Sequence, residues 1–116
     1  MEKKYQVVSL ELSRKLKELG FKQESLFYWL ENENGDYCLE CINDFIGTPS
    51  KLFYSAYTVA ELGEMLPDNY NSYKKNKEWF CRFKEDTGYE ILSSDKENEA
   101  NARAKMLIYL KENKLI

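Results

Sequence analysis

The sequence predicts one two-layer α+β domain over residues 1–116, with three helices on one face of an antiparallel sheet of about five strands. Stretches with apolar residues at helical spacing alternate with runs in which apolar and polar residues alternate, which indicates a mixed fold. The chain has nine Tyr, six Phe and two Trp, residue types that favour half-buried sheet. At 116 residues, folding buries roughly two-thirds of the unfolded surface, so one core is expected.

The first helix is predicted over residues 10–19. Ser9 is placed to cap its N-terminus, and Gly20 lies where a glycine commonly ends a helix. Its apolar residues share one face at helical spacing: Val8, Leu12, Leu16 and Leu19.

A hairpin follows, with strands predicted over residues 26–33 and 36–42. Asn34-Gly35 between them favours a type I′ turn, which needs a positive φ at both central positions. After a loop, a short strand is expected over residues 52–56.

The second helix is predicted to begin after Thr58, which forms a capping box with Glu61. It ends at Leu66, because Pro67 cannot continue a helix and restricts the residue before it. Gly63 weakens this helix by roughly 1 kcal/mol relative to alanine. We therefore expect another part of the chain to pack closely against Gly63.

Residues 68–77 are predicted to form a polar loop before a second hairpin, with strands over residues 78–85 and 89–92. The last helix is expected over residues 95–113, with Ser94 and Glu97 as a possible capping box. The predicted order is therefore α-β-β-β-α-β-β-α. Three residues of the second hairpin are expected on its core side: Trp79, Cys81 and Phe83. Residues of the last helix expected in the core are Ala100, Ala104, Leu107 and Leu110, with Glu99 and Arg103 as an ion pair.

The chain contains no histidine, which removes the usual general base and the commonest metal ligand. Its cysteines include a C-x-x-C pattern at Cys38 and Cys41, but only Cys81 remains as a further thiol. A zinc site needs more ligands, and positions 38 and 41 of a strand point to opposite faces. We expect buried or inert thiols, no metal and no cofactor.

The net charge of −3 argues against a duplex-DNA-binding domain, which is usually strongly basic. No apolar run reaches the length of about 18 residues that a membrane span requires. The first residues also lack the apolar segment of a signal peptide, so a cytoplasmic protein without membrane contact is expected.

The leading functional hypothesis is a non-catalytic protein-interaction module. Both faces of the first hairpin carry large apolar residues, although a one-sided sheet normally has polar residues outward. Either a helix covers each face, or an exposed patch binds another protein or a second copy of the chain. The candidate contact residues are Tyr28, Trp29 and Leu30.

The alternative is a single-stranded nucleic-acid-binding protein that uses segment 70–84. Aromatic and basic residues alternate there, as in proteins that stack bases and hold phosphates. The competing interpretation is that the aromatic residues face the core and the lysines solvate a loop, with Glu85 and Asp86 opposing nucleic acid. The candidate residues are Tyr73, Lys74, Lys75, Lys77, Phe80 and Arg82.

An enzyme that works through carboxylates alone is not expected. The acidic clusters lie in contexts typical of a solvated surface: Glu31, Glu33 and Asp36 around the first turn, and Glu61 and Glu64 on the second helix. Paired carboxylates support acid–base chemistry only where burial separates their pKa values.

Several segments resemble a family of small uncharacterised proteins from bacteria, their prophages and their phages. The resemblance spans nearly the whole chain and is most specific over residues 58–67 and 100–116. It implies an accessory protein of a mobile element and carries no established activity, cofactor or catalytic residue. The segments concerned are LKELGF, FYW, YTVAELGEMLP, WFCRF and EANARAKMLIYLKENKLI.

Overall fold

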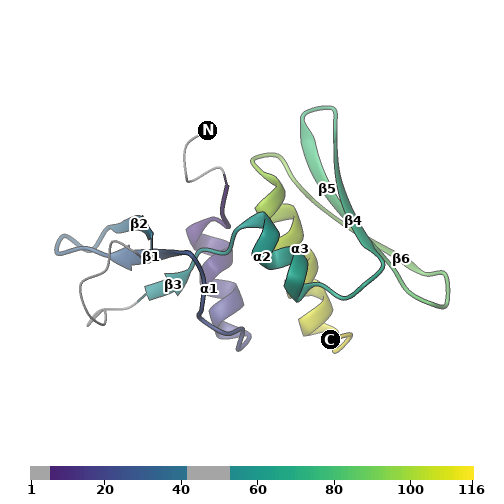
Figure 1. Cartoon of the computed structure of the whole chain (residues 1–116), viewed down its shortest axis with the longest axis horizontal. Coiled ribbons are helices and arrows are strands. Elements are labelled where there is room, and N and C mark those ends of the chain that lie inside the picture. The colour runs from purple at the N-terminus through teal and green to yellow at the C-terminus, as the bar shows by residue number, and fades with distance from the viewer. Residues whose placement is uncertain (1–5, 42–52) are drawn as a thin grey trace.

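The computed structural model describes residues 6–41 and 53–116. Within these residues the chain forms three helices and two three-stranded antiparallel sheets. The helices lie between the two sheets (Figure 1). The α+β class is therefore confirmed, whereas the single five-stranded sheet in two layers is wrong. The elements are α1 (Leu10–Glu18), β1 (Phe27–Glu31), β2 (Tyr37–Cys41), β3 (Phe53–Ser55), α2 (Val59–Met65), β4 (Tyr70–Lys75), β5 (Glu78–Lys84), β6 (Glu90–Asp95) and α3 (Glu99–Glu112).

The first sheet has the order β2-β1-β3, and the predicted hairpin joins β1 to β2. The predicted type I′ turn is wrong, because in this turn Gly35 adopts a positive φ of 85° and Asn34 does not. Asn32 organises a wider loop instead: its N–H donates to the Asp36 carbonyl, and its side-chain oxygen accepts from the N–H groups of Asn34 and Asp36. The ends of the predicted strands at residues 42 and 52, and the loop between them, lie outside the described residues.

The second sheet has the order β4-β5-β6, and β4 occupies most of the predicted loop over residues 68–77, which is a further correction. The ladder runs from Tyr70 opposite Phe83 to Lys75 opposite Glu78. Asn76-Lys77 connects the strands with φ values of 52° and 64°, as a type I′ turn requires. An edge strand with a solvated face carries so many polar residues that its sequence resembles a loop.

The last helix begins at Glu99, not at residue 95. Asn98 caps it, with a side-chain oxygen that accepts from the Asn101 N–H at 2.6 Å. The predicted Ser94–Glu97 capping box is wrong, because Ser94 pairs with Phe80 inside the second sheet. Asp95 ends that strand, and its carboxylate accepts from the N–H groups that follow, which turns the chain into α3.

The core is built on α3, which packs against β5 and β6 and also contacts α1 and α2. Small side chains early in α3, such as Ala100 and Ala104, allow the helix to approach the sheet closely. The other elements contribute Leu16, Leu62, Cys81 and Ile91. The buried residues of α3 are Ala100, Asn101, Ala102, Ala104, Met106, Leu107, Ile108 and Leu110.

Candidate nucleic-acid interface

The second sheet has an inner face toward α3 and an outer face on which no described helix packs (Figure 1). Ser72 identifies the inner side of β4, because its hydroxyl contacts Arg103 of α3. Side chains alternate along each strand, so the ladder assigns the remaining residues. The outer face consists of Asn71, Tyr73 and Lys75 on β4, Glu78, Phe80, Arg82 and Lys84 on β5, and Glu90, Leu92 and Ser94 on β6.

An aromatic pair lies on this outer face. Tyr73 and Phe80 are directly opposite each other across β4 and β5, with ring centroids 5.3 Å apart and planes at 18°. Tyr73 is exposed and Phe80 is half-buried. Aromatic rings on an uncovered sheet are a surface on which unpaired bases stack.

The charges on the outer face are mixed. Lys75 lies opposite Glu78, and Lys84 lies opposite Glu90. Arg82 lies between Asn71 and Leu92, with no acidic residue opposite it in either neighbouring strand. Arg82 is therefore the cation of this face that is best placed to meet a phosphate.

The structure brings together four of the six residues in the nucleic-acid hypothesis, since Tyr73, Lys75, Phe80 and Arg82 share the outer face. Lys77 lies in the adjoining turn. Lys74 points to the inner face, where its Nζ atom lies 5.5 Å from the centroid of the Trp79 ring. The sequence did not identify Asn71 as a residue of the outer face, because the residues of β4 were predicted to form a loop. The alternation of residues 80, 82 and 84 was sufficient to place Lys84 beside Arg82.

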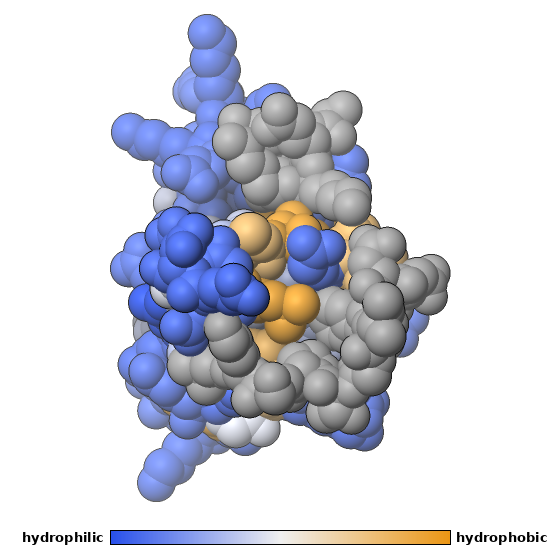
Figure 2. Space-filling view, turned by 90° about the vertical axis from the view of Figure 1, so that its left-hand side faces the viewer, coloured by the Kyte–Doolittle hydropathy of each residue, from blue (hydrophilic) through white to orange (hydrophobic). Residues whose placement is uncertain are grey.

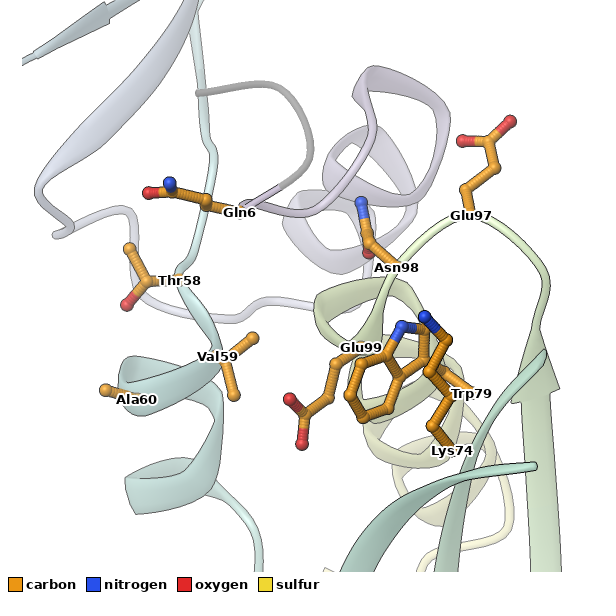
Figure 3. Close-up of a pocket in the computed structure, with 9 residues that line it drawn as sticks. All are labelled: Gln6, Thr58, Val59, Ala60, Lys74, Trp79, Glu97, Asn98 and Glu99. Carbon is orange, nitrogen blue, oxygen red and sulfur yellow. The ribbon is translucent and has the colours of Figure 1, made fainter. Parts of the chain in front are cut away.

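A pocket of about 550 Å³ lies on the inner side of the same hairpin, between the N-terminal ends of α2 and α3 (Figure 3). We call it the α2–α3 pocket. It is lined by Gln6, Thr58, Val59, Ala60, Lys74, Trp79, Glu97, Asn98 and Glu99. Of these residues only Lys74 was selected as a site residue from the sequence, because the lining comes from four stretches of the chain that lie far apart in sequence.

The residues of the protein-interaction hypothesis lie in β1. Tyr28 is 7% exposed, and its hydroxyl accepts from the Ser25 N–H and donates to the Gln23 carbonyl. Trp29 is half-buried and donates its indole N–H to the Val8 carbonyl at 3.0 Å. Leu30 is also half-buried. Figure 2 shows a small apolar patch at the end of the molecule that carries this sheet. Tyr28 therefore contributes to folding rather than to an accessible surface.

The cysteines and carboxylates form no evident reactive site in the described part of the chain. Cys38 is exposed, Cys41 is half-buried and Cys81 is buried, and all are free thiols. Burial raises the pKa of Cys81 to about 11, which keeps it protonated at neutral pH. Residues 6–41 and 53–116 hold no group of three or more His, Cys, Asp or Glu that could bind a metal. Glu61 forms the predicted capping box with Thr58 and also accepts from the Leu26 N–H.

Comparison with protein-family models finds no match, and comparison with curated proteins and with solved structures finds none either. Among the helices of the described residues, none combines the length and apolar character needed to cross a bilayer. The outer face and the α2–α3 pocket are the two surfaces whose geometry suits ligand binding.

Proposed function

We propose that this protein binds single-stranded nucleic acid through the outer face of the second sheet. The observation that supports this proposal is the stacked Tyr73–Phe80 pair on an uncovered sheet face, with Arg82 on the same face. Unpaired bases stack on such rings, and a guanidinium group binds phosphate with two parallel hydrogen bonds.

Stacking supplies most of the expected affinity. Each stacked base contributes about 1–3 kcal/mol, whereas the two lysines of the outer face have glutamates opposite them. Arg82 and Lys77 are the cations left to contact phosphates. Two phosphate contacts to a single strand predict a decrease of log K with log salt of about 1.4. This small slope is compatible with a net charge of −3.

Fluorescence anisotropy with a labelled single-stranded 12-mer of mixed sequence, at low and moderate salt, tests the proposal. Phe80→Ala should weaken binding by about 5- to 150-fold, the equivalent of 1–3 kcal/mol. Tyr89→Ala is the matched control, because Tyr89 is an exposed aromatic residue outside the strands. Binding that is absent at low salt, or lost equally in both variants, would contradict the proposal.

A protein partner is the second candidate, supported by the apolar patch in Figure 2 and by Leu92, which is 56% exposed on the outer face. The partner proposed here is another protein or a second copy of the chain. Light scattering over a range of protein concentrations tests self-association. An apparent molecular mass that rises with concentration supports a homodimer, and a monomer at every concentration rules out self-association.

The proposed role is non-catalytic, because the charged groups on the outer face lie opposite one another in the ladder or are suited to holding phosphate. An accessory role in phage or prophage biology, in the bacterial cytoplasm, belongs to the same proposal and comes from the family resemblance. Affinity purification from such a host, with and without nuclease, should recover nucleic acid that Phe80→Ala fails to retain.

A further inference from the structure

The α2–α3 pocket has the size and the walls of a small-molecule site. Its volume of about 550 Å³ lies within the range of roughly 300–1,000 Å³ that is usual for ligand pockets. Val59 of α2 forms one apolar wall, and the indole ring of Trp79 forms another (Figure 3). A flat ring inserted between these walls would stack on Trp79.

The charges of the pocket limit the ligand that it suits. The Lys74 ammonium lies over the Trp79 ring and would repel a cationic side chain from that position. Glu97 and Glu99, which also line the pocket, would repel an anion. A neutral ring is favoured if it carries hydrogen-bond acceptors toward Lys74 and donors toward a carboxylate.

Glu99 is the carboxylate that is held in place. Its Oε2 atom accepts from the Ser72 hydroxyl and from Arg103 Nη2, the latter at 3.3 Å. In Figure 3 its carboxylate lies between Val59 and Trp79. Glu97 is exposed at the rim and precedes the helix. An acceptor fixed in advance at the pocket costs less side-chain entropy when it binds a ligand.

We propose that the α2–α3 pocket binds one unpaired guanine base. Guanine presents the O6 and N7 acceptors that a lysine recognises. Its Watson–Crick edge carries two adjacent N–H donors. Glu99 would accept from this edge through Oε1, because Oε2 accepts from Ser72 and Arg103, while the ring stacks on Trp79. Adenine lacks the O6 acceptor and the N1–H donor, and pyrimidines offer a smaller ring to the indole.

This inference rests on the proposed function, because the guanine would belong to the strand held on the outer face. Lys74 and Trp79 form the ladder pair next to Tyr73 and Phe80, on the opposite side of the sheet. A strand that passes around the end of this hairpin, where Lys75 and Lys77 are exposed, would reach both sites.

Titration with guanosine, adenosine, cytidine and uridine 5′-monophosphates, followed by tryptophan fluorescence and calorimetry, tests the base. Guanosine monophosphate should bind about tenfold more tightly than the others. Glu99→Gln should remove this preference, whereas Glu97→Gln, the matched control, should leave it. Val59→Phe narrows the pocket from the half-buried first residue of α2, whose side chain points toward Trp79 (Figure 3), and should abolish nucleotide binding.

Equal affinity for all four nucleotides, or binding that survives Val59→Phe, would overturn the guanine pocket. The outer face is tested separately with an oligothymidylate, which contains no guanine. If the oligothymidylate binds and Phe80→Ala weakens it while guanosine monophosphate does not bind, the proposed function stands and the pocket inference fails. If guanosine monophosphate binds equally to the wild type and to Phe80→Ala while the oligothymidylate does not bind, the pocket stands without the outer-face proposal.

Discussion

At the scale of single residues, Arg103 determines what can occupy the first turns of α2. Its guanidinium group donates to the Val59 carbonyl at 2.9 Å, contacts Ser72 of β4 and pairs with Glu99 of its own helix. A Cβ atom on Gly63 would lie 2.6 Å from Arg103 Nη1 and 2.7 Å from the Tyr70 hydroxyl. The glycine is therefore the residue that allows α2 to lie against this group, as the sequence indicated.

Gly63→Ala should destabilise the protein by about 1–2 kcal/mol, although alanine is the better helix former. The added methyl group displaces a guanidinium that holds three elements together. Ala60→Gly, at an exposed position of the same helix, is the control and should cost about 1 kcal/mol through helix propensity alone. Urea denaturation measures both variants. If Gly63→Ala raised the free energy of unfolding, the close contact would not govern this position.

Cys81 links the stability of the core to alkaline pH. Burial raises its pKa from 9.0 to about 11, so above pH 9 the unfolded chain releases this proton while the native state retains it. The free energy of unfolding therefore falls as pH rises through this window. Between about pH 8 and 10.5 the wild type should lose about 2 kcal/mol more than Cys81→Ala. Denaturation curves of both proteins at the two pH values check this, and parallel losses would contradict it.

At the scale of elements, the turn of the β4–β5 hairpin contains one residue, Lys77, that does not favour its geometry. Asn76 and Lys77 both have positive φ. Asparagine tolerates this conformation, whereas for lysine it costs about 1–2 kcal/mol. Glycine adopts this region freely, although it costs about 0.4–1 kcal/mol through the unfolded chain. Lys77→Gly should therefore raise the free energy of unfolding by roughly 0.5–1 kcal/mol.

Lys75→Gly is the matched control for this change, because Lys75 lies in the neighbouring extended strand. There glycine gains nothing from the backbone and should destabilise the protein. Thermal unfolding compares the two variants. A lower midpoint for Lys77→Gly would show that the lysine side chain contributes more to the fold than its backbone costs.

The elements that sequence could predict are those whose signals are local. Thr58 and Glu61 form their capping box within one helical turn, and Ser9 accepts from the Leu12 N–H as expected. The start of α3 depends on Asp95, whose carboxylate is also held by Lys105 from the following helix. Such longer-range partners are not visible in a local sequence pattern. For the same reason, the sequence did not predict strand β4, and it predicted one sheet where the structure has two.

The site was predictable to a similar degree. The alternation of residues in β5 was sufficient to place Phe80 and Arg82 on one side of a strand, and this is what the structure has. The α2–α3 pocket was not predictable, because Val59, Lys74 and Glu99 come together only when both helices pack beside the second sheet.

At the scale of the whole molecule, the segment Val7–Ser9 joins the two sheets. The Val8 N–H donates to the Tyr57 carbonyl, and the Val8 carbonyl accepts from the Trp29 indole of the first sheet. On the other side, Asn98 of the α3 cap donates to the Val7 carbonyl at 3.2 Å. Val7 and Val8 are fully buried, so these hydrogen bonds are formed away from water and their loss is costly.

Asn101 completes this junction and provides a test of its importance. It is 3% exposed, accepts from the Ser9 N–H at 2.8 Å and donates to the Asp95 carboxylate at 3.3 Å. Asn101→Ala should cost about 1–3 kcal/mol, because it leaves the Ser9 N–H without this partner. This loss of free energy should weaken the contact between the half of the fold that contains the first sheet and the half that contains the second sheet.

Trp29 and Trp79 lie in different sheets, so each reports on one half of the molecule. Trp79→Phe leaves Trp29 as the reporter and Trp29→Phe leaves Trp79, and fluorescence-detected urea unfolding gives a midpoint for each background. Because Trp29→Phe itself removes the hydrogen bond to the Val8 carbonyl, each further substitution is compared with its own background. Asn101→Ala should lower the midpoint reported by Trp29 more than the midpoint reported by Trp79, whereas Asn71→Ala on the outer face should shift neither. If Asn101→Ala lowered both midpoints equally, the packing of α1 against α3 would be sufficient to hold the halves together, and the polar junction would contribute stability without governing cooperativity.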